Sequence, residues 1–305
     1  MSLSKSGTST SQVGISVDEE RVSVAVANHA NQPPTITHIT TVPVEKSISA
    51  SLQNALQAVS ANGADAVFAL KVTDTRFHKV QKPSVPVEER DSSLLFLMKD
   101  RLSQAVDNTL IGCVDYPEGC RHDDQLMVFE VNKPHIASLV DAAQDNGLTI
   151  AAIDASELLY GDLIFSEEDM HKGIGILVEH DRGVHLLLYR DHSLYLIRKL
   201  QDIVDLMSCL PAPGNAQMAD TLMLEVQRTL DYYDSLMGQP APANLYLVPS
   251  FMDLSPLAEY LDSSLAPSVS MLDLNTLFDL PQALDHATQQ DVISAVAASL
   301  RRSHQ

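Results

Sequence analysis

Histidine and carboxylate side chains, which can act as metal ligands, gather in one short stretch of the sequence. Glu179, His180 and Asp181 come first, and His185 and His192 follow. Imidazole and carboxylate groups are ligands that zinc accepts. These residues, however, straddle a predicted hairpin turn and the strand after it, and they lack the regular spacing of a ligand set. The pattern favours a solvated turn, so we predict no metal site.

The cysteines also give no sign of a metal site, and the common catalytic motifs are absent from the sequence. Cys113, Cys120 and Cys209 are an odd number without C-x-x-C spacing, which favours packed thiols in a reducing compartment over a zinc site. The sequence contains no G-x-S-x-G, P-loop or H-E-x-x-H motif. We therefore predict no catalytic residues and a protein that is not an enzyme.

Charge narrows the classes of partner. The 305 residues carry a formal net charge of -20, which disfavours phosphate backbones and anionic lipid headgroups. No apolar run reaches the roughly 18 residues of a membrane span, and the N-terminus has no secretory signal pattern. We predict a cytoplasmic protein that binds no nucleic acid and does not insert into a membrane.

The order of predicted elements indicates an α/β fold with two lobes. Residues 1–12 are rich in Ser, Thr and Gly and are predicted to be a disordered tail. Residues 13–165 form the first lobe, with an inserted α/β subdomain at about 75–150, and residues 173–305 form the second. The division depends on a repeat, because the hairpin and third strand of residues 13–44 recur from Gly173 onward.

Three stretches resemble one known family. They are VQRTLDYYDSLMGQPAPANLYLVPS (226–250), TRFHKVQKPSVPVEER (75–90) and LLLYRDHSLYLIRKL (186–200). The chain resembles the PilM family of type IV pilus assembly proteins, and within it the shorter MSHA-pilus branch, the MshI type. The likeness extends from about Val13 to Leu300. It implies the actin-like (ribonuclease H-like) fold, with a small insertion in the first lobe.

That fold holds ATP on two hairpin turns and a glycine-rich turn, and the first hairpin departs from the family pattern. The family opens with G-I-D-I-G-S, but this chain has Ser16 where the Mg²⁺ aspartate belongs and Asp18 where a phosphate-binding glycine belongs. A carboxylate about 4 Å from a phosphate costs roughly 1 to 4 kcal/mol per charge pair.

The other two nucleotide-binding turns depart as well. Where the family has V-D-I-G, this chain reads Val178, Glu179, His180 and Asp181, and the glycine is missing in either of two registers one residue apart. The adenosine turn has become Val248, Pro249 and Ser250. We therefore predict a degenerate nucleotide site with neither ATP nor Mg²⁺ as cofactor.

The resemblance also implies a partner. PilM-type proteins bind the short cytoplasmic N-terminal peptide of a single-pass inner-membrane protein of PilN type, in a groove between the first lobe and its insertion. By position, five apolar residues are candidates for lining that groove. They are Phe77, Val80, Val85, Leu95 and Met98. Each of them is an equally good candidate for the core of the insertion.

The function implied is a scaffold of a pilus assembly platform, peripheral at the inner membrane through its partner. Two alternatives remain open. One is a working actin-like ATPase of pilus assembly with divergent turns. The other is the cytoplasmic module of a type II secretion-like system, which has the same fold.

Overall fold

A computed structural model describes residues 11–57, 59, 64–71, 73–122, 124–180, 183–212 and 216–302, apart from the side chains of Ala216 and Leu236. The chain forms two compact units. The first contains Met1–Lys71, Ser138–Phe165 and Leu274–Gln305, and the second contains Val72–Ala137 and Ser166–Asp273. Within the described ranges, no helix has both the length and the apolar character to cross a membrane.

The first unit is built on a five-stranded sheet of order β3-β2-β1-β4-β8. Its strands are β1 (Ser11–Val17), β2 (Arg21–Asn28), β3 (Thr35–Pro43), β4 (Asp65–Leu70) and β8 (Thr149–Ala155). Its helices are α1 (Ile48–Leu56), α4 (Ser156–Leu159), α8 (Leu274–Leu277), α9 (His286–Ser299) and the part of α3 (Lys133–Asp145) from Ser138 onward. The pair β1 and β2 is antiparallel, whereas β1 with β4 and β4 with β8 are parallel.

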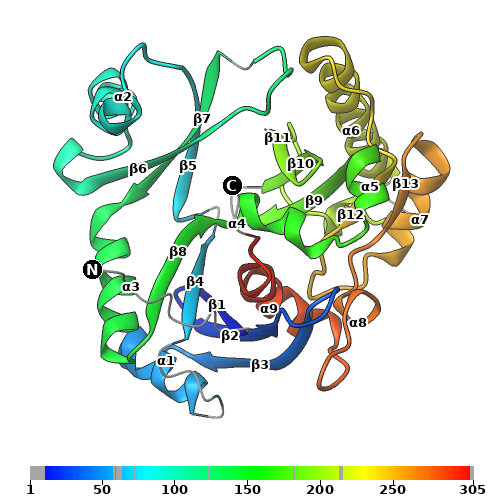
Figure 1. Ribbon diagram of the computed structural model, residues 1–305. Helices are drawn as coiled ribbons and strands as arrows, with labels where there is room; N and C mark the ends of the chain where they lie inside the picture. Colours follow the sequence, from blue (N-terminus) through cyan, green and yellow to red (C-terminus); the bar gives the residue numbers. More distant parts are fainter. Residues whose placement is uncertain are drawn as a thin grey trace. The chain divides into compact units, whose positions relative to one another are not determined.

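The last helix, α9, packs on β1, β2 and β4, and in Figure 1 it (red) lies beside the blue strands β1 and β2. Gly14 makes the close approach possible. A Cβ atom on Gly14 would lie 2.0 Å from the carbonyl oxygen of Ala295 and 2.2 Å from the amide nitrogen of Ser299. Because α9 is buried on almost every side, it forms part of the core of the first unit.

The second unit repeats this architecture with the strand order β11-β10-β9-β12-β13. Its strands are β9 (Ile174–His180), β10 (Gly183–Arg190), β11 (Ser193–Lys199), β12 (Asn244–Leu247) and β13 (Ser268–Met271). Its helices are α5 (Glu167–Lys172), α6 (Ala216–Met237) and α7 (Ser255–Ser264). An antiparallel three-stranded meander is followed by two parallel strands in both sheets, so the predicted repeat of the two halves is confirmed.

The second unit also contains a small sheet of order β5-β7-β6. Its strands are β5 (Thr75–Gln81), β6 (Thr109–Asp115) and β7 (Gln125–Asn132), and the short helix α2 (Arg90–Met98) packs on β6. Arg121 joins this sheet to the rest of the unit, because its guanidinium donates a 2.5 Å hydrogen bond to the carbonyl oxygen of Ser235 in α6.

The observed boundaries differ from the predicted ones in three places. Ser11 and Gln12 belong to β1, not to a tail, and Gln12 Nε2 donates to the carbonyl oxygen of Ala298 at 2.8 Å. Residues 1–10 lie outside the described residues. Leu274–Gln305 belongs to the first unit instead of the second, because α9 packs on the first sheet. The insertion, Val72–Ala137, groups with the second unit.

Candidate functional site

The turn between β1 and β2 is the first of the predicted nucleotide-binding segments. Ser16 is buried in β1, opposite Ser23 of β2. Asp18 begins the turn, and its Oδ1 accepts hydrogen bonds from the amides of Glu20 at 2.8 Å and Arg21 at 2.7 Å. Backbone amides of such turns are the donors that hold a phosphate in nucleotide-binding proteins. In this protein the carboxylate of Asp18 already accepts from them.

The ammonium group of Lys71, at the end of β4, pairs with the other carboxylate oxygen of Asp18. Burial alone would raise the pKa of Asp18, but the hydrogen bond and charge of Lys71, together with the two amides, hold that pKa below its ordinary value. Asp18 is therefore an ionised group that is fully engaged within its own unit.

We expect Asp18→Ala to lower the free energy of unfolding by about 1 to 2 kcal/mol, because two amides lose their acceptor and Lys71 loses its partner. Asp18→Asn keeps an acceptor for the amides and should cost less. Urea denaturation of the single variants, of Lys71→Met and of Asp18→Ala/Lys71→Met checks this. The double variant should lose less free energy of unfolding than the sum of the losses of Asp18→Ala and Lys71→Met. Strict additivity would show that the pair does not interact.

The second predicted segment lies at the end of β9. Val178 is buried, and Glu179 accepts a 2.9 Å hydrogen bond from the amide of Leu206. Burial raises the pKa of Glu179, and the nearby Asp205 adds to that effect. The ring of His180 lies 5.9 Å from that of His185, and Asp181 is outside the described residues. The carboxylate of Glu179 is thus engaged by the loop after β11.

The third predicted segment follows β12. Val248, Pro249 and Ser250 are all buried, and the amide of Val248 donates to the carbonyl oxygen of Leu177 at 3.0 Å. Val248 thus extends the pairing of β12 with β9, and Pro249 and Ser250 follow it as buried residues where the family has glycines. Among the described residues, no group of three or more His, Cys, Asp or Glu side chains is placed to hold a metal ion.

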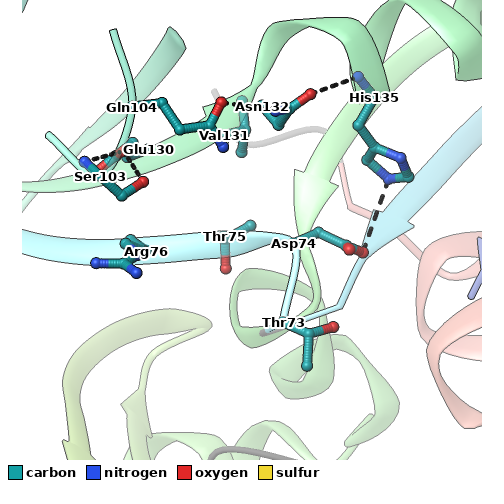
Figure 2. Close-up of a pocket in the computed structure, with 10 residues that line it drawn as sticks. All are labelled: Thr73, Asp74, Thr75, Arg76, Ser103, Gln104, Glu130, Val131, Asn132 and His135. Atoms are coloured by element: carbon teal, nitrogen blue, oxygen red, sulfur yellow. Dashed lines mark hydrogen bonds and ion pairs between the residues drawn. The ribbon is translucent and has the colours of Figure 1, made fainter. Parts of the chain in front are cut away.

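The sequence did not predict a cavity of the small sheet, which has a volume of about 400 Å³ and lies at the base of β5 and β7 (Figure 2). It is lined by Thr73, Asp74, Thr75, Arg76, Ser103, Gln104, Glu130, Val131, Asn132 and His135. Nine of these ten side chains can form hydrogen bonds, and one of the ten, Val131, is aliphatic. Such a lining suits a peptide backbone or polar side chains better than an apolar ligand.

Glu130 is the buried centre of this cavity, with a relative exposure of 3%. Its carboxylate accepts from the amide of Ser103 at 2.7 Å, from the Ser103 hydroxyl at 2.5 Å and from His78 at 2.9 Å. Burial would raise the pKa of Glu130, but these hydrogen bonds outweigh it and hold the pKa below its ordinary value. Glu130 therefore fixes the segment after α2 against β7.

The other side of the cavity is held by Asn132. Its amide group donates to Gln104 at 2.7 Å, and its carbonyl oxygen accepts from the backbone amide of His135 at 2.9 Å. The imidazole of His135 lies 3.8 Å from the carboxylate of Asp74 (Figure 2). The lining comes from three separate chain segments, and hydrogen bonds between their side chains shape the cavity before any ligand binds.

The structure separates the five residues predicted to line a partner groove. The predictions for Val80 and Met98 are wrong, because both belong to the hydrophobic core between α2 and the sheet, together with Leu94, Leu126 and Val128. Phe77, Val85 and Leu95 are half-buried, and the ring of Phe77 lies 5.8 Å from that of Phe129. None of the five lines the polar cavity.

No model of a protein family matches the sequence, and no curated protein matches it. Solved structures do match. One, described as the PilM-PilN type IV pilus biogenesis complex, is similar at 15% identity with a TM-score of 0.65, over 95% of this chain and 96% of that one.

Two further solved structures are similar. A protein from Bacteroides thetaiotaomicron, described as having an actin-like ATPase fold and unknown function, has 11% identity and a TM-score of 0.51, over 89% and 93% of the two chains. The cytoplasmic domain of EpsL, an inner membrane component of the type II secretion system of Vibrio cholerae, has a TM-score of 0.48 at 13% identity, over 80% and 84%. The repeated sheet order and the first two likenesses confirm the prediction: the protein has the actin-like α/β fold.

Proposed function

We propose that this protein is a scaffold of a type IV pilus assembly platform, of the MSHA (MshI) type, and that it binds the N-terminal cytoplasmic peptide of a PilN-like inner-membrane protein. The observation that supports this most is the likeness, over nearly the whole chain, to a structure described as a PilM-PilN complex. The protein would then be cytoplasmic and reach the inner membrane through that single-pass partner.

The polar cavity of the small sheet is the site that we propose for the peptide. Its volume of about 400 Å³ suits a few residues of an extended chain, and its hydrogen-bonding lining suits a peptide backbone. Because Glu130 and Asn132 are already fixed by neighbouring groups, little ordering of the protein is needed when the peptide enters.

We further propose that the protein works without nucleotide, as a pseudo-ATPase. The support comes from the three predicted nucleotide segments taken one at a time. Asp18 accepts from the amides of its own turn, Glu179 accepts from Leu206, and Val248 to Ser250 are buried. In each of the three segments, described residues are hydrogen-bonded or buried within the protein, which supports a site that holds no nucleotide.

The test is a calorimetric titration with a synthetic peptide of roughly 15 residues from the N-terminus of the PilN-like protein of the same pilus system. We expect a micromolar Kd, or about -8 kcal/mol. Gln104→Trp, which places a large ring at the cavity, should weaken binding at least tenfold. Gln217→Trp, at an exposed glutamine of α6, should leave it unchanged. Absence of binding by the unsubstituted protein would overturn the proposal.

A further inference from the structure

Strand β5 is an edge strand of the small sheet. The strand order is β5-β7-β6, and in the described part of the chain β5 pairs with β7 alone. An edge strand has a row of backbone N–H and C=O groups that no neighbouring strand satisfies, and these groups can pair with another extended chain. The polar cavity adjoins this strand, because Thr75 and Arg76, its first two residues, line it.

The two faces of β5 differ in chemistry. Successive side chains of a strand point to opposite faces. Arg76 and His78 lie on the face of Glu130, which bonds to His78, whereas Phe77 lies on the other face, with its ring 5.8 Å from that of Phe129. Phe77 is half-buried, so part of its ring is available to an added neighbour.

Arg76 is exposed at the cavity, and within the described chain its guanidinium has no hydrogen bond or ion pair. A guanidinium group has five N–H donors and no acceptor. The group next to it in a complex is therefore expected to be an acceptor, such as a carboxylate or a carboxamide.

We propose, resting on the proposed function, that the partner peptide binds as an additional strand on the free edge of β5. In this arrangement, backbone hydrogen bonds hold the peptide. An apolar side chain of the peptide packs beside Phe77 on one face of the sheet, and a side chain with a hydrogen-bond acceptor lies beside Arg76 on the opposite face. The partner segment is thus extended, with apolar and polar residues that alternate over the part that meets β5.

An N-methyl scan of the synthetic peptide tests the backbone pairing. In an added strand, alternate amides point to the protein, so methylation at every second position should weaken binding at least tenfold, and methylation at the positions between should change it less than about threefold. Loss at all positions alike, or at none, would overturn the added strand. Failure of the unmethylated peptide to bind would instead overturn the proposed function.

Three variants of the protein locate the strand. Arg76→Gln should weaken binding about tenfold, with an unchanged melting temperature because the side chain is exposed. The matched control is Arg101→Gln, an exposed arginine outside the cavity, which should leave the Kd unchanged. Val114→Asp, on the opposite edge strand β6, should also leave it unchanged. Loss of binding with Val114→Asp and not with Arg76→Gln would place the peptide on β6 and refute the proposal.

Discussion

Gly14→Ala is expected to lower the free energy of unfolding by about 3 kcal/mol or more, the largest loss that we predict for a single methyl group. The new Cβ would lie 2.0 Å from the carbonyl oxygen of Ala295, 2.2 Å from the amide nitrogen of Ser299 and 2.9 Å from the carbonyl carbon of Ala298. All three are backbone atoms of α9 or of its end, so no side chain can rotate away. The helix must move off the sheet.

The matched control for this change is Gly112→Ala in β6, where an added Cβ meets no atom within 4 Å. Here alanine restricts the unfolded chain without a clash, so stability should stay level or rise by up to about 1 kcal/mol. Urea denaturation of both variants gives the comparison. A Gly14→Ala protein as stable as the parent would show that α9 does not pack on β1 as described.

Glu157→Gln is expected to stabilise the protein by about 3 kcal/mol at pH 8 and to have little effect near pH 4.5. Glu157 is buried at the start of α4, and this burial raises its pKa to about 7, although its own amide and Ser156 donate to it and oppose the shift. The ordinary pKa of a glutamate side chain is 4.5, and a tenfold change in an acid constant corresponds to about 1.4 kcal/mol.

The sign follows from proton uptake. Between pH 4.5 and about 7 the folded state keeps the proton of Glu157 whereas the unfolded state loses it, so the stability of the parent falls as pH rises through that window. Glutamine does not titrate, so the free energy of unfolding of the Glu157→Gln variant does not fall in this window because of residue 157. Urea denaturation at pH 5 and pH 8 measures the difference. Glu259→Gln, an exposed carboxylate of α7, should change stability by less than about 0.5 kcal/mol at both. A pH-independent effect of Glu157→Gln would contradict the burial of an ionisable group there.

The repeated halves could be predicted from the sequence because a β-hairpin can be recognised from a short stretch of neighbouring residues. Short β-rich runs on either side of a polar turn specify β1 with β2 and β9 with β10, without knowledge of distant residues. The recurrence of that pattern from Gly173 then predicts an equivalent three-stranded unit in each half.

The place of α9 could not be predicted in the same way. A helix exposed on one side has an apolar stripe that shows which face packs, but α9 is buried on nearly every side and has no such stripe. The position of the helix depends on the space left by Gly14. The need for a glycine there is apparent only once Ala295 and Ser299 are known to pack against it. For this reason the sequence assigned α9 to the wrong half.

The candidate peptide site shows the same limit. Val80 and Met98 were candidates by their position in the sequence, and position alone cannot distinguish the core of the insertion from an open groove. The cavity itself is polar and is assembled from residues 73–76, 103–104 and 130–135. Polar residues have no periodicity that links segments so far apart, so Glu130 and Asn132 gave no signal before the sheet was known.

The most direct test of the scaffold is one titration made twice, with the partner peptide added to the protein in the absence and in the presence of 1 mM Mg-ATP. We expect the same micromolar Kd in both, because the amides of the Asp18 turn and the segment after β12 are already occupied or buried. Binding that appears only with Mg-ATP, or that tightens tenfold with it, would mean that nucleotide governs the partner and would contradict a scaffold that works without it.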